Sequence, residues 1–326
     1  MTRFVLSRLL WAAPNVVAIL VICFLTIHIL PGDPVHVLVG DFPAPAEYIE
    51  QIRREFGLDK PLLTQLWLYV SNLAHGNLGY SFANRQPVLG LLLARTQITL
   101  LLMLPALTLA ALAGIVCAVA AAPRAGSLYD SVITALSLFG YSVPIFWLGQ
   151  ILILVFAVDL RWLPAQGMIS LRTPPTGMGV VWDVMWHLVL PAFSITIYFM
   201  AVVARVARAS VLETLNNDFV LTARSKGLTA RQVMWRHVLP NALIPVITVI
   251  GYSFGSSLTG AILVETVFGW PGLGSLLITS ITNRDYPVLQ GIFLFTALLV
   301  VFVNLITDVL YGAIDPRTRT VARQSE

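Results

Sequence analysis

Long apolar runs separated by polar stretches dominate the pattern of this sequence. A helix that crosses a bilayer needs roughly 20 mostly apolar residues, and about six runs meet that requirement. They lie near Leu9–Leu30, Ile98–Ala121, Ser131–Val158, His187–Val206, Asn241–Val264 and Val288–Ile314. Some of them contain a proline (Pro14, Pro105, Pro144, Pro191 and Pro245), which membrane helices tolerate because neighbouring groups satisfy the carbonyl that proline frees. We therefore expect an all-α, polytopic membrane protein with about six transmembrane helices.

The composition supports this interpretation. Hydrophobic residues make up 57% of the chain and charged residues only 11%, whereas a soluble domain carries about a quarter charged residues. Mean hydropathy is +0.83, so much of the apolar surface must face lipid. The net charge of +4 is more typical of the basic cytoplasmic flanks of a membrane protein than of nucleic-acid binding. Because no signal-peptide cleavage pattern follows the first run, we expect it to be a retained anchor.

The distribution of basic residues predicts the orientation of the chain. Short cytoplasmic loops are enriched in Lys and Arg. Here basic residues flank both ends, follow the second run and are dense between the fourth and fifth runs, whereas the short connections on the other side hold few. The basic residues on the expected cytoplasmic side are Arg3, Arg8, Arg124, Arg205, Arg208, Arg224, Lys226, Arg231, Arg236, Arg317, Arg319 and Arg323. Both termini are therefore expected in the cytoplasm of a bacterium, with the chain in the inner membrane.

A long polar connection, about Pro31 to Arg95, separates the first two runs. An amphipathic helix is predicted there by apolar residues at helical spacing, namely Tyr48, Ile49, Ile52 and Phe56. A second half-apolar stretch, Leu62 to Leu73, carries Trp67 and Tyr69, residue types that suit a lipid–water interface. A loop of this length is usually functional or a small folded lid, so contact with an external partner and simple packing both remain open.

The polar segment Asn217–Arg231 is the most informative part of the chain. It begins with an Asn–Asp pair, which favours a helix start, and reaches Gly227, a residue type that closes helices in a left-handed turn. Phe219 and Ala223 are four residues apart and share one face of the expected short helix, where they are candidates for an apolar contact with another protein. A positive-inside loop that only fixes topology explains the same residues equally well.

The same segment carries a family resemblance. Phe219–Leu228, followed by Leu239-Pro240, resembles the Glu-Ala-Ala loop of importer permeases of the ATP-binding cassette class, and more specifically the dipeptide, oligopeptide and nickel permease family. Leu221 departs from the pattern of the wider class, which has Glu there, and His237 stands where an aliphatic residue is frequent. Further strings similar to that family occur in its order: Leu30-Pro31-Gly32-Asp33-Pro34, Phe56-Gly57-Leu58-Asp59-Lys60-Pro61, Gly76-Asn77-Leu78-Gly79, Glu265–Gly274, Arg284–Val288 and Asp315-Pro316-Arg317.

The resemblance implies a fold, a function and partners. The fold would be that of a type I importer permease, and the long first loop is similar to that of the first of two paired permeases. The chain would be the permease subunit of an ATP-driven importer of di- or oligopeptides. Its partners would be a homologous second permease, two ATPase subunits and an extracytoplasmic solute-binding protein, besides membrane lipid. It would hold no catalytic residue and no cofactor of its own, because ATP and Mg²⁺ would be bound by the partner subunits.

The resemblance also implies roles for particular residues. The segment from about Asp218 to Lys226 would be the coupling helix, which enters a cleft of the ATPase subunit and transmits nucleotide-driven closure to the spans. The residues so assigned are Asp218, Phe219, Thr222, Ala223, Lys226 and Gly227. Permeases of this architecture are also compatible with other cargo, namely nickel complexes, glutathione, opines or oligosaccharides.

Motifs for rival functions are missing. A P-loop needs a glycine-rich cradle followed by Lys and Ser or Thr, and neither Lys60 nor Lys226 follows a glycine. The sequence has no His-Glu-x-x-His zinc pattern and no acid–base set for an enzyme that acts on lipid. We therefore expect neither a metal site nor an enzyme.

A proton-coupled secondary transporter is the rival from another class. It would need titratable residues in several spans, whereas Asp308, four residues after Asn304 in the last run, is nearly alone. Asp308 either lines the translocation path or pairs with an arginine such as Arg205 or Arg208 and fixes helix packing; we favour the pairing.

Along the chain we expect three parts. Residues 1–96 would form the first transmembrane helix with the long extracytoplasmic loop. Residues 97–316 would form the permease core with the coupling helix near 217–230, and residues 317–326 a cytoplasmic tail.

Overall fold

The computed structural model describes residues 2–29, 34–39, 43–172 and 175–314. Two of the family-like strings therefore lie partly or wholly outside the described residues, namely residues 30–33 of the first string and the string Asp315-Pro316-Arg317. The expected cytoplasmic tail, 317–326, lies outside them as well.

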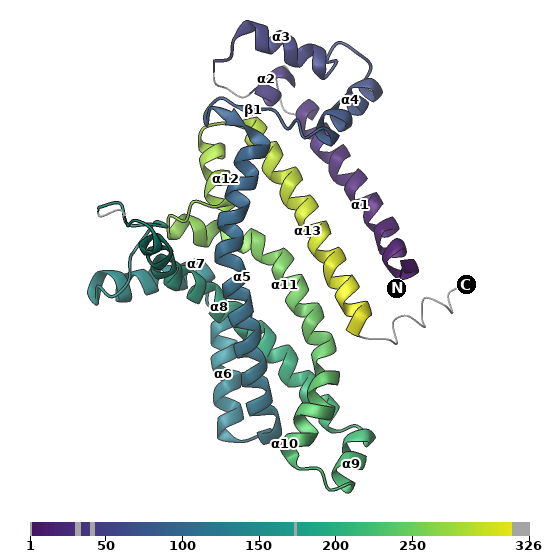
Figure 1. Cartoon of the computed structure of the whole chain (residues 1–326), viewed down its shortest axis with the longest axis vertical. Helices are drawn as coiled ribbons and strands as arrows, with labels where there is room; N and C mark the ends of the chain where they lie inside the picture. The colour runs from purple at the N-terminus through teal and green to yellow at the C-terminus, as the bar shows by residue number, and fades with distance from the viewer. Residues whose placement is uncertain (1, 30–33, 40–42, 173–174, 315–326) are drawn as a thin grey trace. The chain divides into compact units, whose positions relative to one another are not determined.

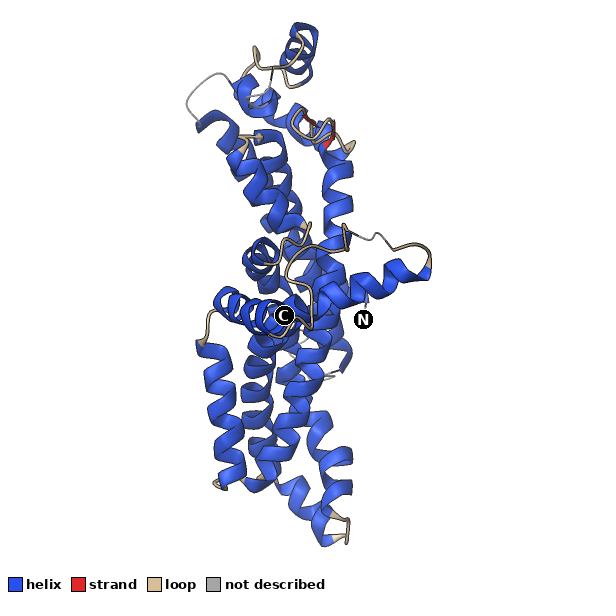
Figure 2. Ribbon diagram, turned by 90° about the vertical axis from the view of Figure 1, so that its left-hand side faces the viewer, coloured by secondary structure: helices blue, strands red, loops and turns tan. Residues whose placement is uncertain are grey.

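The described chain is helical almost throughout, with strand only in one short hairpin (Figure 2). The helices are α1 (Thr2–Ile29), α2 (Pro34–Val39), α3 (Ala46–Glu55), α4 (Leu62–Ala74), α5 (Val88–Ala121), α6 (Leu128–Ser142), α7 (Ile145–Leu152), α8 (Met178–Leu215), α9 (Asp218–Ser225), α10 (Ala230–Val233), α11 (Leu239–Val267), α12 (Leu273–Thr282) and α13 (Tyr286–Ile314). The 3₁₀ turn η1 (Ala122–Arg124) and the π-helical segments η2 (Ile153–Asp159) and η3 (Met234–Val238) join some of them. Strands β1 (Tyr80–Ser81) and β2 (Gln86–Pro87) pair antiparallel, with Tyr80 opposite Pro87.

Four described helical segments are long and apolar enough to cross a membrane: Val88–Arg124, Met178–Leu215, Ala230–Gly255 and Tyr286–Val309. They confirm apolar helices of spanning length over four of the predicted runs. The bent pair Leu128–Ser142 and Ile145–Asp159 adds one more if it is counted as a single span. The described apolar part of α1, Leu10–Thr26, is shorter, so the sixth span and the placement of the termini stay predictions.

The third predicted run is not one continuous helix. α6 and the helical segment that begins with α7 meet at an angle of 98°. The break falls at Val143, whose backbone is extended at φ −80° and ψ 126°, and at Pro144. Proline disfavours helical backbone at the residue before it and has no N–H to donate. Pro144 therefore divides the predicted span Ser131–Val158 into two helices, whereas Pro14, Pro105, Pro191 and Pro245 lie inside continuous helices.

The chain forms two compact units, and each has its own packing. The first, unit 1, comprises residues 2–5, 101–270 and 303–314 of the described chain. In it α8 contacts α6, α7 and α11, which are labelled in Figure 1. A Cβ atom on Gly114 would lie 2.8 Å from Val203, and one on Gly140 would lie 3.2 Å from Ile197. Small residues at such contacts let membrane helices approach closely.

The second, unit 2, comprises the described residues between 6 and 100 together with 271–302. Its core joins Phe24 of α1, Ile52 of α3, Tyr69 of α4 and Leu294 of α13. The predicted amphipathic helix is confirmed as α3, with Ile52 and Phe56 buried. Tyr69 is also buried, close to the rings of Phe24 and Phe56, so its predicted interfacial position is wrong.

Family-like strings far apart in the sequence meet in unit 2. Asp285, which is 2% exposed, accepts hydrogen bonds from Ser81 Oγ at 2.5 Å and from Asn84 Nδ2 at 3.3 Å. Ser81 and Asp285 are 204 residues apart in the chain. Gly79 has φ +90°, and a Cβ atom there would lie 3.7 Å from Pro287. These contacts hold the β-hairpin against the turn between α12 and α13.

Candidate functional site

The predicted coupling helix is present as α9, Asp218–Ser225. Asn217 precedes it with extended backbone, although its side chain makes no capping hydrogen bond. At the other end Gly227 has φ +79°, and its N–H donates to the carbonyl of Arg224 at 2.9 Å. Glycine takes this left-handed conformation at helix ends without the steric cost that a Cβ atom adds. The predicted helix start and the predicted role of Gly227 as its stop are both confirmed.

The inner face of α9 is anchored in unit 1. Val220 is 1% exposed and Ala223 is 4% exposed. They belong to a buried group, called the anchor cluster below, that consists of Ala122, Val211, Val220, Ala223, Val233, Met234, Val238 and Ala242. Its members come from η1 after α5, from α8, α9, α10 and η3, and from α11. The short helix is therefore packed against the ends of three long helices.

The outer face of α9 is exposed and mixed in chemistry. Leu221 is 66% exposed and Phe219 is 41% exposed, and polar and basic side chains surround them: Asp218, Thr222, Arg224, Ser225 and Lys226 are all exposed. Arg231 and Arg236, on the segment that follows, are exposed too. The exposed surface of α9 thus presents apolar side chains within a mainly basic rim.

Of the two residues predicted to contact another protein, Ala223 is buried within unit 1 and Phe219 is exposed. Successive helix residues are about 100° apart, so the buried pair Val220 and Ala223 defines an inward direction that leaves Phe219 at the edge. Leu221 then lies on the opposite side, near the centre of the outer face. Of the residues assigned to coupling, Asp218, Phe219, Thr222 and Lys226 are exposed, Ala223 holds the helix in place, and Gly227 ends it.

The segment after α9 returns the chain to the long helices. Thr229 Oγ1 accepts from the N–H of Gln232 at 3.3 Å, and Gln232 Oε1 accepts from the N–H of Thr229 at 2.9 Å. This reciprocal capping box begins the short helix α10. The π-helical η3, which contains His237, then leads into α11. Single π-helical turns often occur at functional sites.

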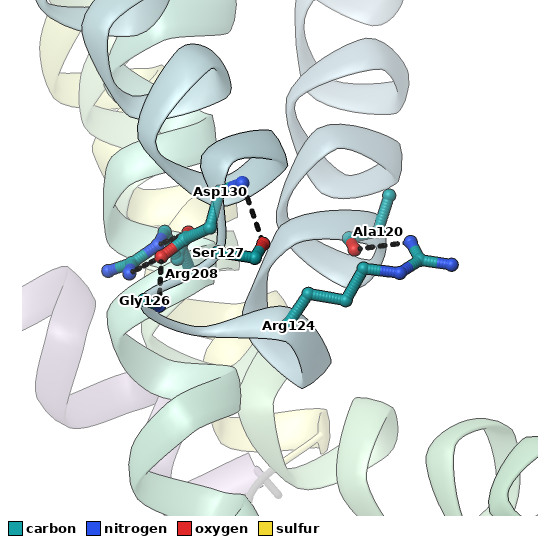
Figure 3. Close-up of polar contacts among 6 residues, drawn as sticks. All are labelled: Ala120, Arg124, Gly126, Ser127, Asp130 and Arg208. Atoms are coloured by element: carbon teal, nitrogen blue, oxygen red, sulfur yellow. Dashed lines mark hydrogen bonds and ion pairs between the residues drawn. The ribbon is translucent and has the colours of Figure 1, made fainter.

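An ion pair that sequence reasoning missed fixes α8 against the start of α6 (Figure 3). Arg208 donates from Nε to Asp130 Oδ1 at 2.6 Å and from Nη2 to Oδ2 at 2.7 Å. The N–H of Gly126 donates to the same carboxylate at 3.0 Å. Two parallel hydrogen bonds make such an Arg–carboxylate pair specific in geometry. The Ser127-x-x-Asp130 spacing, typical of a helix start, was the signal available in the sequence.

The two polar residues predicted in the last span both lie in α13. Asn304 is exposed and Asp308 is half-buried. Of the two arginines considered as partners of Asp308, Arg208 is bound by Asp130, and the Arg205 guanidinium lies over the Tyr141 ring. The choice between a pathway role and a packing role for Asp308 stays a prediction. Among the residues described, no cluster of three or more His, Cys, Asp or Glu side chains is arranged to hold a metal ion.

Comparisons with known proteins cover nearly the whole chain. The family model for the inner membrane component of binding-protein-dependent transport systems matches residues 110–320, and the model for the N-terminal part of such membrane components matches residues 1–103. The chain is 42% identical to a di/tripeptide transport system permease protein, DppB, of Pseudomonas aeruginosa, covering 98% of this chain and 99% of the relative. It is 40% identical, with the same coverage, both to the dipeptide permease DppB and to the glutathione permease GsiC of Escherichia coli.

A solved structure shares the fold. A chain from an inward-facing form of the methionine ABC transporter MetNI matches with a TM-score of 0.56 at 16% sequence identity. The match covers 69% of this chain and 96% of that chain. At this identity the likeness concerns the fold alone, which is the predicted type I importer permease fold.

Proposed function

Because the chain belongs to the family of inner membrane components of binding-protein-dependent transport systems, we propose that it is the permease subunit of an ATP-driven importer that carries di- and oligopeptides across the inner membrane. The observation that carries the substrate class is relatedness over nearly the full length to permeases named for di- and tripeptides. Glutathione, named for another relative, is itself a tripeptide with free carboxylates. Peptide import is therefore favoured over import of nickel complexes, opines or oligosaccharides.

We further propose that the outer face of α9 is the surface on which an ATPase subunit docks. Leu221 and Phe219 supply exposed apolar contact area, and Arg224 and Lys226 supply charge at the rim. Amphipathic helices with this arrangement fit grooves on partner proteins. The residues that bind ATP and Mg²⁺ would belong to that partner.

The anchor cluster supplies the mechanical link. A displacement of α9 reaches α8 through Val211, the end of α5 through Ala122, and α11 through Ala242. Burial of a valine such as Val220 contributes about 1.5–3 kcal/mol, so α9 resists detachment from these helices. Closure of two ATPases would therefore move the ends of the spanning helices as rigid bodies and switch the side of the membrane to which the pathway opens.

The complete assembly would contain a homologous second permease, two ATPases and an extracytoplasmic solute-binding protein. The family description includes dependence on a binding protein, and the fold is that of permeases from ATP-binding cassette importers. By the distribution of basic residues, α9 and both termini face the cytoplasm, and residues 31–95 face the binding protein's side of the membrane.

The test is purification of the chain from its native membrane, identification of the co-purifying subunits, and reconstitution of the complex into liposomes. We expect a second permease and P-loop ATPases to co-purify. Uptake of a radiolabelled dipeptide should require both ATP and the binding protein. Uptake of glutathione or a nickel complex, with no uptake of dipeptides, would refute the substrate class. Uptake by this chain alone, driven by a proton gradient, would refute the ATP-driven mechanism.

A further inference from the structure

A cluster of polar aromatic and basic side chains lies on the membrane-spanning helices of unit 1, away from α9. Tyr141 comes from the end of α6, Tyr198 and Arg205 from α8, and Tyr252 from α11. The Tyr141 and Tyr198 rings are stacked with centroids 5.4 Å apart, and the Arg205 guanidinium carbon lies 4.5 Å from the centroid of the Tyr141 ring. Tyr141, Tyr198 and Arg205 therefore form one cluster, and Tyr252 lies on α11, which packs against α8.

Three of these four side chains are exposed although they lie on helices of the membrane-spanning part of the chain. Tyr141 is 44% exposed and Tyr252 is 73% exposed, and Arg205 is exposed as well. An exposed polar row continues along α11, where Asn241, Thr248 and Tyr252 recur at intervals of seven and four residues. These intervals correspond to about two turns and one turn of a helix, so the three side chains share one face.

Arg205 points into the apolar part of its span. The Asp130–Arg208 ion pair joins α6 and α8 at one level. At about 1.5 Å per residue, Tyr141 lies roughly 16 Å from Asp130 along α6, whereas Arg205 lies only about 5 Å from Arg208 along α8. Contact between the guanidinium and the Tyr141 ring therefore requires the Arg205 side chain to extend toward the N-terminal end of α8, which is the usual tilt of helical side chains. An arginine that faced lipid would instead extend toward the nearer headgroups.

Lipid is a poor environment for this face. Charged and polar side chains within spans almost always face a bundle interior or a water-filled cavity, because their exposure to hydrocarbon costs several kcal/mol. The Tyr141 ring covers one face of the Arg205 guanidinium and leaves the N–H groups at its edge available. Within the described residues no carboxylate forms an ion pair with Arg205. The site therefore suits an incoming planar anion, which guanidinium binds through two parallel hydrogen bonds.

We propose that Tyr141, Tyr198 and Tyr252 line the translocation path and that Arg205 binds the free carboxylate of a peptide in transit. The proposal rests on the proposed function, since that function supplies the cargo. A carboxylate at the C-terminus is common to peptides of every sequence, so its recognition lets one path accept many side chains. The tyrosines add hydroxyl groups for the peptide backbone and ring surface for its side chains, and neither requires a particular residue.

The first test measures whether this face is wet and cationic. Thr248→Cys, one turn from Tyr252, is compared in the reconstituted complex with Leu112→Cys, a control on α5 whose native side chain is 59% exposed. Each variant is treated with an anionic sulfonatoethyl and a cationic trimethylammonium-ethyl methanethiosulfonate, and rates are normalised to a free thiol. Cys23 is buried and Cys117 half-buried, so the parent chain gives the background labelling.

We expect the Thr248→Cys thiol to react and the Leu112→Cys thiol to remain unmodified. The anionic reagent should be faster by about tenfold, since a cationic cavity concentrates anions by that order. Arg205→Gln should abolish the preference, and Arg205→Lys should retain it. If the Thr248→Cys thiol is as unreactive as the control in a complex that still imports peptide, lipid or the second permease covers the face and the proposal is wrong. Equal rates for the anionic and the cationic reagent would show that Arg205 does not attract anions to this face.

The second test addresses the cargo. Arg205→Gln should lower ATP-dependent uptake of a dipeptide about tenfold, while the partner subunits still co-purify with the chain in parental amounts. Arg205→Lys should restore most of the uptake because it restores the charge. Equal uptake by parent and Arg205→Gln would overturn carboxylate binding and leave the ATP-driven importer intact. Uptake by the parent complex without ATP would refute the proposed function. The labelling experiment measures thiol reactivity alone, so it would still show whether this face is wet and cationic.

Discussion

The anchoring of α9 can be tested by two neighbouring substitutions that should have opposite consequences. Val220 is 1% exposed and lies in the anchor cluster, whereas Leu221 is 66% exposed on the outer face. Val220→Ala removes two methylene-sized groups at about 0.8 kcal/mol each, and incomplete collapse of the space adds up to about 1 kcal/mol. A loss of about 2 kcal/mol in the attachment of α9 follows, which raises its detached population roughly 30-fold.

Leu221→Ala should behave differently. Substitutions at exposed positions usually change stability by less than about 0.5 kcal/mol, so α9 should remain attached. An exposed leucine at the centre of a docking surface loses contact area with the partner instead, and residues that dominate such interfaces cost more than about 1 kcal/mol of binding when truncated. We therefore expect Leu221→Ala to weaken ATPase binding while the helix itself stays folded.

Amide hydrogen exchange of the purified chain, followed by mass spectrometry of peptides covering 218–227, measures the first effect. Co-purification of the ATPase and ATP-dependent uptake measure the second. Val220→Ala should accelerate exchange about 30-fold across α9, and Leu221→Ala should leave exchange unchanged but reduce co-purification. Equal exchange in Val220→Ala and the parent chain would refute the anchoring, and faster exchange in Leu221→Ala would show that the two faces were assigned the wrong way round.

Three further substitutions test other parts of the structure. Gly227→Ala should cost about 1 kcal/mol because a Cβ atom is disfavoured at φ +79°; uptake at normal membrane level should fall, and unchanged uptake would count against a role for this turn in coupling. Asp130→Asn should lower the free energy of unfolding by about 1–3 kcal/mol, because Arg208 keeps its charge and loses its partner. A double-mutant cycle with Arg208→Gln should show coupling between the two residues, and additive effects would mean that the ion pair contributes little. Ser81→Ala should lower the free energy of unfolding by about 1–3 kcal/mol, because the buried Asp285 loses a hydrogen-bond donor. The β-hairpin should then be cleaved faster by a protease, and an unchanged cleavage rate would show that this hydrogen bond does not hold the hairpin in place.

Local signals in the sequence were sufficient for much of the fold. Apolar runs of the right length predicted four spanning helices that the structure contains, because a bilayer imposes a minimum length on any helix that crosses it. Turn chemistry placed the start of α9 after Asn217 and its end before Gly227. The spacing of Ile52 and Phe56 predicted α3 and its buried face. Each of these features depends on residues within a few turns of one another.

Features that depend on contacts between distant residues were decided by the tertiary structure. The Asp130–Arg208 ion pair joins positions 78 residues apart, and no local pattern links them. The inward face of α9 depends on Val211 and Ala242, which lie on other helices, so the sequence alone did not show that Val220 and Ala223 face inward and that Ala223 is buried. In membrane helices both the lipid-facing side and the packed side are apolar, and periodicity therefore distinguishes them poorly. For the same reason only the folded chain brings Tyr141, Tyr198 and Arg205 together.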